Sequence, residues 1–157
     1  MLKILMVCLG NICRSPLAEA ILVEKLKNKG LYDVQVDSAG TSSYHIGEKP
    51  DLRTITNARK HGLEISHLIT RQFTLNDFDL FDKIYVMDHS NYTNVVELAR
   101  NEEDIKKVEL ILNVSHPGSN MTVPDPYFGG DLGFENVYNL LNEACDRIVM
   151  NIQNKNF

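Results

Sequence analysis

Apolar residues dominate the first strand-like segment of the chain. A continuous apolar run from Ile4 to Val7 is followed by Cys8 and Leu9 and then interrupted by Gly10 and Asn11. A short apolar run that ends in a turn is typical of a strand buried on both faces of a parallel sheet. We therefore expect this strand to lie in the centre of the sheet.

The segment after this strand has the pattern of a helix. Ser15 is a favourable N-cap residue, and Pro16 is favoured at the first helical position. The apolar stripe that follows at helical spacing consists of Leu17, Ile21, Leu22 and Leu26. The sequence predicts a helix from about Ser15 to Lys29, with Gly30 as its stop.

Strands and helices then alternate along the rest of the chain. The further predicted strands are Val34–Ala39, Lys83–Met87 and Val108–Leu112. Three further helices are predicted: one that begins at Pro50, one from about Ser90 to Arg100, and one over Phe134–Ile152. This alternation predicts an α/β fold: a single domain over residues 1–157, with a four-stranded parallel sheet flanked by helices on both faces. Ligands of such folds bind beyond the carboxyl ends of the strands.

Composition narrows the function classes. The chain has 16 Lys and Arg against 21 Asp and Glu, a formal charge of −5, so we expect no nucleic-acid partner. The longest apolar stretch is far too short to span a bilayer and lacks a secretory cleavage site, which favours a cytoplasmic protein without a membrane span. No His or Cys pair has zinc-ligand spacing, so we expect no metal and no other cofactor.

The turn between the first strand and the first helix carries the most informative chemistry. Five residues separate Cys8 from Arg14 in Cys8-Leu-Gly-Asn-Ile-Cys-Arg-Ser15. Turned by Gly10 and Asn11, such a loop directs successive N–H groups inward over a helix N-terminus and binds an anion. Arg14 can hold two phosphate oxygens at once. The same positive field favours an ionised Cys8, so the sequence predicts a phosphate-binding loop that contains a thiolate nucleophile.

A general acid is still needed to protonate a leaving oxygen. Asp125 lies in Val123-Pro-Asp-Pro-Tyr127, where the flanking prolines limit its movement. Its position between the fourth strand and the last helix places it at the same end of the sheet as Cys8. Asp88, which follows the third strand, is the second candidate, and we interpret it more simply as a structural hydrogen-bonding group.

Four segments together resemble the low-molecular-weight protein tyrosine phosphatases. They are Cys8–Pro16, Asp37–Thr41, Met87–Asn91 and Asp125–Tyr127, which occur in that family's order. The resemblance covers essentially the whole chain. It implies metal-free hydrolysis of phosphotyrosine and small aryl phosphates through a cysteinyl-phosphate on Cys8, with Asp125 as acid and then base and Arg14 stabilising the phosphate.

The resemblance also implies roles for supporting residues. The remaining residues of the phosphate-binding loop would be Leu9, Gly10, Asn11, Ile12, Cys13 and Ser15, with Ser15 donating to the thiolate. Ser38 and His67 would join Asn11 in holding the loop in shape. The substrate pocket would be walled by Leu9, Ile12, Tyr44, Tyr127 and Phe128, and Phe128 stands where the family commonly has a second tyrosine. The expected partners are phosphotyrosine-containing proteins, and the expected assembly is a monomer or a weak dimer.

The other two cysteines have different interpretations. Cys13 is either inert packing or the partner of a disulfide with Cys8 that shields the nucleophile from irreversible oxidation. Cys145 lies on the apolar stripe of the last helix, so we expect a structural role.

Two alternative functions use the same loop. An arsenate reductase on this fold would bind arsenate in place of phosphate, but it needs a relay of further cysteines, and this chain offers only Cys145 in its later part. A non-catalytic phosphate- or phosphotyrosine-binding module would keep the loop without hydrolysis. The presence of both Cys8 and Asp125 argues against the second alternative.

Overall fold

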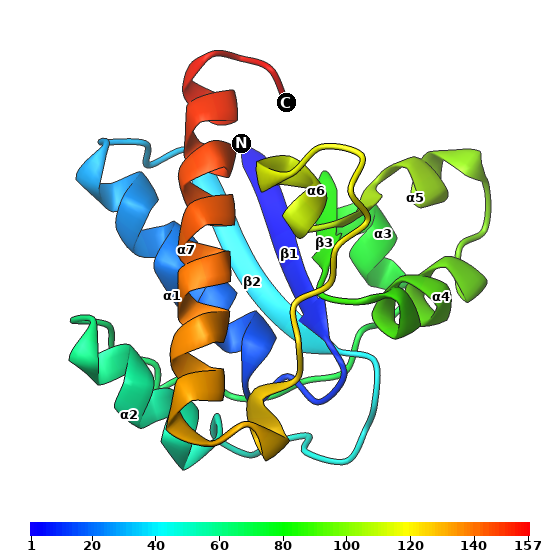
Figure 1. The fold of residues 1–157 in the computed structure, drawn as a ribbon. Helices are drawn as coiled ribbons and strands as arrows, with labels where there is room; N and C mark the ends of the chain where they lie inside the picture. Colours follow the sequence, from blue (N-terminus) through cyan, green and yellow to red (C-terminus); the bar gives the residue numbers. More distant parts are fainter.

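Four parallel strands run through the centre of the fold (Figure 1). β1 (Leu2–Cys8) lies between β2 (Val34–Gly40) and β3 (Lys83–Val86), and β4 (Val108–Leu110) pairs with β3. The computed structural model describes residues 1–157 with the exception of the Phe128 side chain. The predicted four-stranded parallel sheet with the first strand in its interior is confirmed.

Successive residues of β1 are buried on opposite faces of the sheet. Ile4 and Met6 belong to one hydrophobic core, whereas Leu5 and Val7 belong to another. All four side chains are fully inaccessible. Burial on both faces explains why this strand is continuously apolar instead of alternating between apolar and polar residues.

Helices cover both faces of the sheet, as predicted (Figure 1). The first core contains residues of α1 (Arg14–Asn28), α2 (Leu52–Lys60), α6 (Leu112–Ser115) and α7 (Gly130–Gln153). The second core contains residues of α3 (Asn76–Leu80) and α4 (His89–Glu97). The short helix α5 (Glu102–Lys106) and the 3₁₀ helix η1 (Pro126–Phe128) complete the secondary structure.

The start of the first helix differs from its prediction. α1 begins at Arg14, with Cys13 at the N-cap position and no side-chain cap, so Ser15 is not the N-cap residue. The Ser15 hydroxyl lies 3.0 Å from the Cys8 sulfur instead. The C-terminal end agrees with the prediction, because Gly30 takes a left-handed φ of 68° directly after the last turn.

Two other boundaries shift for local reasons. The helix predicted from Ser90 to Arg100 is α4, which begins at His89 because Asp88 and Asn91 form a capping box. The strand predicted to reach Leu112 ends at Leu110, because Ile111 already has helical backbone angles and leads into α6.

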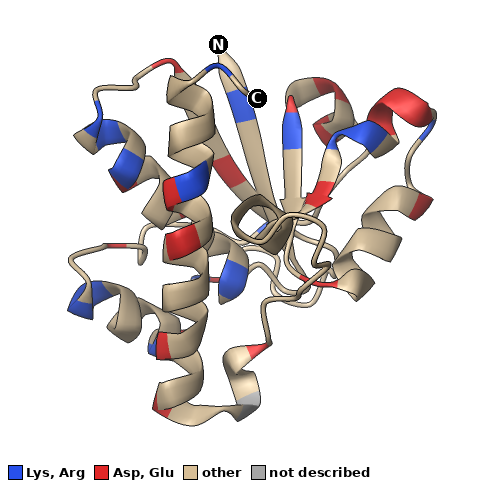
Figure 2. Cartoon of the chain, turned by 45° about the horizontal axis from the view of Figure 1, so that its top comes forward, with Lys and Arg blue, Asp and Glu red and all other residues tan. Residues whose placement is uncertain are grey.

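Charged residues of both signs are interspersed along the helices and loops (Figure 2). Within the described residues, no helix combines the length and the apolarity that crossing a membrane requires.

Candidate active site

The segment from Cys8 to Ser15 forms a loop at the carboxyl end of β1. Cys8 is the last residue of the strand, and α1 begins at Arg14. Asn11 turns the loop with a left-handed φ of 57°, a conformation that asparagine adopts more readily than most residues. The loop therefore leads directly from the central strand into the N-terminus of a long helix.

The carbonyl groups of this loop are bound on its outer side. The carbonyl oxygens of Cys8, Leu9 and Ile12 accept bonds of 2.9 Å from the backbone N–H groups of Thr41, Ser42 and Asp51, respectively. In a trans peptide the N–H points away from the carbonyl, so the N–H groups of Leu9, Gly10 and Cys13 point to the inner side. These three N–H groups have no protein acceptor in the described part of the chain. Inward-facing donors of this kind bind an oxyanion.

Gly40 allows the end of β2 to lie directly against the loop. A Cβ atom at this position would come within 2.7 Å of the Leu9 carbonyl oxygen and 3.0 Å of the Asn11 nitrogen. Both neighbours are backbone atoms, which cannot move aside as a flexible side chain can. Only glycine fits here without displacing the loop.

The sulfur of Cys8 lies at the base of the loop, where two polar groups face it. The Asn11 N–H donates to Cys8 Sγ at 3.3 Å, and Ser15 Oγ lies 3.0 Å from the same atom. Cys8 itself is only 2% exposed. A thiolate at this position would accept from both groups, which would stabilise its negative charge.

The side chain of Asn11 is held at all of its polar positions. Its Nδ2 donates to Ser15 Oγ at 2.8 Å and to Ser38 Oγ at 3.0 Å, and its Oδ1 accepts from the Arg71 N–H at 3.0 Å. Ser38, which is predicted to support the loop, and Ser15 both accept from this amide. The backbone of Arg71 binds the amide oxygen, and His67, which is also predicted to support the loop, is exposed and has no hydrogen bond to Asn11 among the described residues.

Arg14 is fixed by two bonds from one nitrogen. Its Nη1 donates to Asp88 Oδ2 at 2.7 Å and to the Val123 carbonyl at 3.0 Å. The side chain is buried, and the Nε and Nη2 donors are not used by these two bonds. A guanidinium held in this way can present two parallel N–H groups to a phosphate.

Asp125 lies on a segment that is attached to the same site. Val123, two residues earlier, binds Arg14 through its carbonyl and donates its N–H to the Met87 carbonyl at 2.8 Å. Asp125 is exposed, and its Oδ1 accepts from the Tyr127 N–H at 3.0 Å. The loop, the guanidinium and the carboxylate together form a site suited to transferring a phosphoryl group.

Comparisons with known proteins agree with this geometry. The sequence profile described as low molecular weight phosphotyrosine protein phosphatase matches residues 3–156. The chain belongs to this family. The low molecular weight phosphotyrosine protein phosphatase of Gallus gallus is 44% identical over 149 residues, which cover 91% of this chain and 90% of that protein. This protein is accordingly a phosphotyrosine phosphatase, a hydrolase.

Solved structures share the whole fold. A protein tyrosine phosphatase from Entamoeba histolytica, crystallised with Hepes in its active site, has a TM-score of 0.93 and 35% identity, and the match covers 100% of both chains. A Drosophila arginine phosphatase has a TM-score of 0.89 and 34% identity, and the match covers 96% of this chain and 98% of that chain.

The residues predicted to wall the substrate pocket of the phosphatase differ in exposure. Leu9 is 45% exposed, Tyr127 is 51% exposed and Tyr44 is 87% exposed, whereas Ile12 is half-buried. The segment that carries Tyr44 lies beside the loop, because a Cβ on Gly10 would meet the His45 ring at 3.1 Å. The side chain of Phe128, the remaining predicted wall residue, lies outside the described residues.

All three cysteines of the phosphatase are buried and unbridged. Burial raises the pKa of the Cys13 thiol to about 12, and the charges of Asp51 and Asp125 act in the same direction. Burial also raises the pKa of Cys145 to about 12. Cys145 is a buried residue of α7 and packs in the first core, which agrees with its predicted structural role.

Sequence reasoning missed Arg53, which supports the acid-bearing segment. Its Nη1 donates to the Tyr127 carbonyl at 3.1 Å, and its guanidinium lies 4.8 Å from the centre of the Tyr127 ring. Asp51, the N-cap of α2, binds the same guanidinium. An arginine two residues after an N-cap aspartate carries no sequence signal for a contact with Tyr127.

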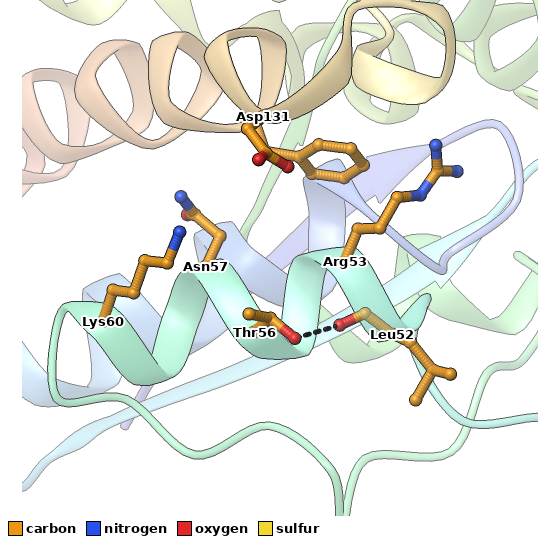
Figure 3. Close-up of a pocket in the computed structure, with 7 residues that line it drawn as sticks. Leu52, Arg53, Thr56, Asn57, Lys60 and Asp131 are labelled. Carbon is orange, nitrogen blue, oxygen red and sulfur yellow. Dashed lines mark hydrogen bonds between the residues drawn. The ribbon is translucent and has the colours of Figure 1, made fainter.

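A pocket that Arg53 helps to line lies between α2 and α7 (Figure 3). Asn57, Lys60 and Asp131 line it together with Arg53. Among the described residues, none from Cys8 to Ser15 lines this pocket, so it is separate from the phosphate-binding loop.

Proposed function

We propose that this phosphatase hydrolyses phosphotyrosine in two steps, with Cys8 as the nucleophile and Asp125 as the general acid. In the first step the Cys8 thiolate attacks phosphorus and the bond from phosphorus to the aryl oxygen breaks. Asp125 gives its proton to the departing oxygen. The products are a cysteinyl-phosphate on Cys8 and a free tyrosine hydroxyl.

The second step restores the enzyme. Asp125, now a carboxylate, takes a proton from the water molecule that attacks phosphorus. The sulfur–phosphorus bond breaks, inorganic phosphate leaves, and Cys8 returns to the thiolate form. This role for Asp125 is supported by its place on a segment whose start, at Val123, is bound to Arg14.

The charge on the transferred group is stabilised by the loop. The inward N–H groups of Leu9, Gly10 and Cys13 and the free edge of Arg14 would bind the non-bridging oxygens in both steps. These groups supply the positive potential that a metal ion supplies in other phosphatases, so we propose a reaction without a metal ion.

The walls of the site favour an aryl phosphate. Leu9, Ile12, Tyr44 and Tyr127 are the proposed walls, and their apolar and aromatic side chains suit the ring of phosphotyrosine better than the short side chain of phosphoserine. We propose Phe128 as a further wall residue on the strength of its sequence position next to Tyr127. Phosphotyrosine-containing proteins are the proposed physiological substrates.

The two alternative functions of the loop have less support. Arsenate reduction needs a relay of further thiols, whereas Cys145 is fully buried in the core. A purely binding module has no use for a carboxylate at Asp125. The likeness to an arginine phosphatase makes phosphoarginine the substrate that must be compared directly with phosphotyrosine.

We further propose that residues 1–157 act as one cytoplasmic phosphatase domain, as a monomer or a weak dimer. The formal charge of −5 and the mixed charges along the helices support a protein that does not bind nucleic acid (Figure 2).

The observation that carries this proposal is the convergence of the Asn11 N–H and Ser15 Oγ on Cys8 Sγ, beneath the inward-facing N–H groups of the loop. The test is an assay in the presence of a chelator, with matched peptides that contain phosphotyrosine, phosphoserine or phosphoarginine. We expect preferential release of phosphate from phosphotyrosine, and acid quenching should trap phosphate on Cys8. The variant Cys8→Ser should bind phosphate without turnover. Substantial turnover by Cys8→Ser, or a preference for phosphoarginine, would overturn the proposal.

A further inference from the structure

A continuous chain of hydrogen bonds connects Cys8 to a carboxyl group on α1. We call it the Glu19–Cys8 chain, and its members are Cys8, Ser15, Asn11, Ser38 and Glu19. Its three outer links are the bond from Asn11 Nδ2 to Ser15 Oγ at 2.8 Å, the bond from Asn11 Nδ2 to Ser38 Oγ at 3.0 Å, and the bond from Ser38 Oγ to Glu19 Oε1 at 2.6 Å. The last link is the shortest of these.

The direction of each bond in this chain follows from donor and acceptor counts. Because the Arg71 N–H binds Asn11 Oδ1, the Asn11 amide group must donate at Nδ2 to both serines. Ser38 Oγ therefore accepts from Asn11, and its single hydrogen is directed to Glu19. Ser15 Oγ also accepts from Asn11, so its hydrogen is directed to Cys8 Sγ at 3.0 Å or to the more distant Ala39 carbonyl at 3.4 Å.

Glu19 is able to change its charge near neutral pH. Burial raises its pKa from 4.5 to about 7, and the negative charge of Asp37 adds to this rise. The bond from Ser38 and the positive charge of Arg71 oppose the rise. In the described part of the chain, Asp37 on β2 and Arg71 before α3 are the charged groups that act on Glu19. Arg71 is itself bound to Asp37 and to the buried Asp77.

We propose that Glu19 is a positioning residue for the nucleophile: its carboxylate fixes the Ser38 hydroxyl, and through it the Asn11 side chain that shapes the phosphate-binding loop. An ionised carboxylate can only accept hydrogen bonds. The Ser38 hydroxyl therefore donates its hydrogen to Glu19 and accepts the bond from Asn11 with a lone pair. A protonated Glu19 brings a hydrogen of its own to the 2.6 Å contact. That hydrogen competes with the one from Ser38, and the charge-assisted bond is lost.

The effect reaches Cys8 because Asn11 contributes both side chain and backbone to the site. The side chain links the two serines, and the left-handed backbone directs the Asn11 N–H to Cys8 Sγ. The ionised form of Glu19 is therefore the form that holds the loop in its catalytic shape. This inference rests on the proposed role of Cys8.

The test compares the wild type with Glu19→Gln, which keeps the size and an acceptor oxygen but never ionises. The turnover number with an aryl phosphate is measured from pH 5.5 to 8.5, and the ratio of wild type to variant is taken at each pH, so that titrations common to both proteins cancel. We expect a ratio near one at pH 5.5 that rises to about 5- to 10-fold at pH 8.5. The matched control is Glu24→Gln, an exposed carboxylate on the same helix, which should give a ratio of one throughout.

A second comparison tests the route through Ser38. In a Ser38→Ala background, Glu19→Gln should have no further effect at any pH, because the connecting hydroxyl is gone. A ratio that does not change with pH, or an undiminished Glu19→Gln effect in the Ser38→Ala background, would overturn the inference. A wild type without activity at every pH would instead overturn the proposed function, so the two failures are distinguishable.

Discussion

Asp88 binds Arg14 with one carboxylate oxygen and caps α4 with the other. Its Oδ2 accepts from Arg14 Nη1 at 2.7 Å, while its Oδ1 accepts from the Asn91 N–H at 2.8 Å. A helix start 74 residues downstream thus fixes the guanidinium that is proposed to bind the phosphate. The interpretation of Asp88 as a structural hydrogen-bonding group agrees with these contacts.

The first prediction removes the charge from Asp88 and keeps its shape. Asp88→Asn still caps a helix, because asparagine is as good an N-cap as aspartate, but the partner of Arg14 becomes neutral. We expect kcat/KM for an aryl phosphate to fall about 10- to 100-fold, because a hydrogen bond between two charged groups is lost. Circular dichroism should show unchanged helix content, and an unchanged kcat/KM would contradict the importance of the ion pair.

The second prediction concerns the proposed acid. Asp125→Ala should lower kcat/KM, which reports the first step, by about 10²- to 10⁴-fold with poor leaving groups such as an alkyl-substituted phenol, because the leaving oxygen departs without a proton. The loss should be much smaller with 4-nitrophenol, which leaves as a stable anion. A plot of log kcat/KM against the pKa of the leaving group would therefore be steeper for the variant than for the wild type. Parallel lines would assign the acid to another residue.

The third prediction uses the contact between β2 and the loop. Gly40→Ala would place a methyl group 2.7 Å from the Leu9 carbonyl oxygen, so the loop must move. We expect weaker binding of inorganic phosphate and a loss of stability of about 1–3 kcal/mol, measured by calorimetry. Gly133→Ala is the control, because its methyl group would have ordinary contacts with Pro126 and should leave phosphate binding intact.

The fourth prediction concerns stability and the titration of Glu19. Because burial raises the pKa of Glu19 from 4.5 in the unfolded chain to about 7 in the folded protein, the folded state binds a proton more tightly. The stabilisation that this tighter proton binding gives the folded protein is complete below pH 4.5 and is lost as the pH rises to 7. Glu19→Gln should remove this loss. Between pH 4.5 and pH 8, the free energy of unfolding in urea should therefore fall by on the order of 2–3 kcal/mol less in the variant than in the wild type. An identical pH dependence in both proteins would show that the carboxyl titrates normally.

The fifth prediction concerns oxidation of the loop. We expect Cys13, which shares the loop with Cys8, to condense with an oxidised Cys8 and form a disulfide. After treatment with peroxide, a thiol reductant should restore activity to the wild type and to Cys145→Ala, but only poorly to Cys13→Ser. Equal recovery in all three proteins would exclude a protective role for Cys13.

The sequence predicts much of this architecture because the signals are local. The continuous apolar run of β1 and the stripe of α7 reflect burial that each segment experiences along its own length. The spacing of Cys8 and Arg14 is likewise local, since one turn connects them.

The unpredicted contacts join residues that are distant in the chain. Arg71 binds Asn11 through its backbone N–H, so its side chain gives no sequence signal for the contact. Only the path of the folded chain decides which group reaches the amide, so the sequence offers no means of choosing between Arg71 and His67. Ser15 has two possible roles in the sequence, as helix cap and as partner of a thiol, and the loop geometry selects the second.

The segment that carries Asp125 is fastened on both sides, to Arg14 through Val123 and to Arg53 through Tyr127. Attachment at both ends limits the positions that the Asp125 carboxylate can reach. For the proposed proton transfer to the leaving oxygen, less orientational entropy then remains to be lost.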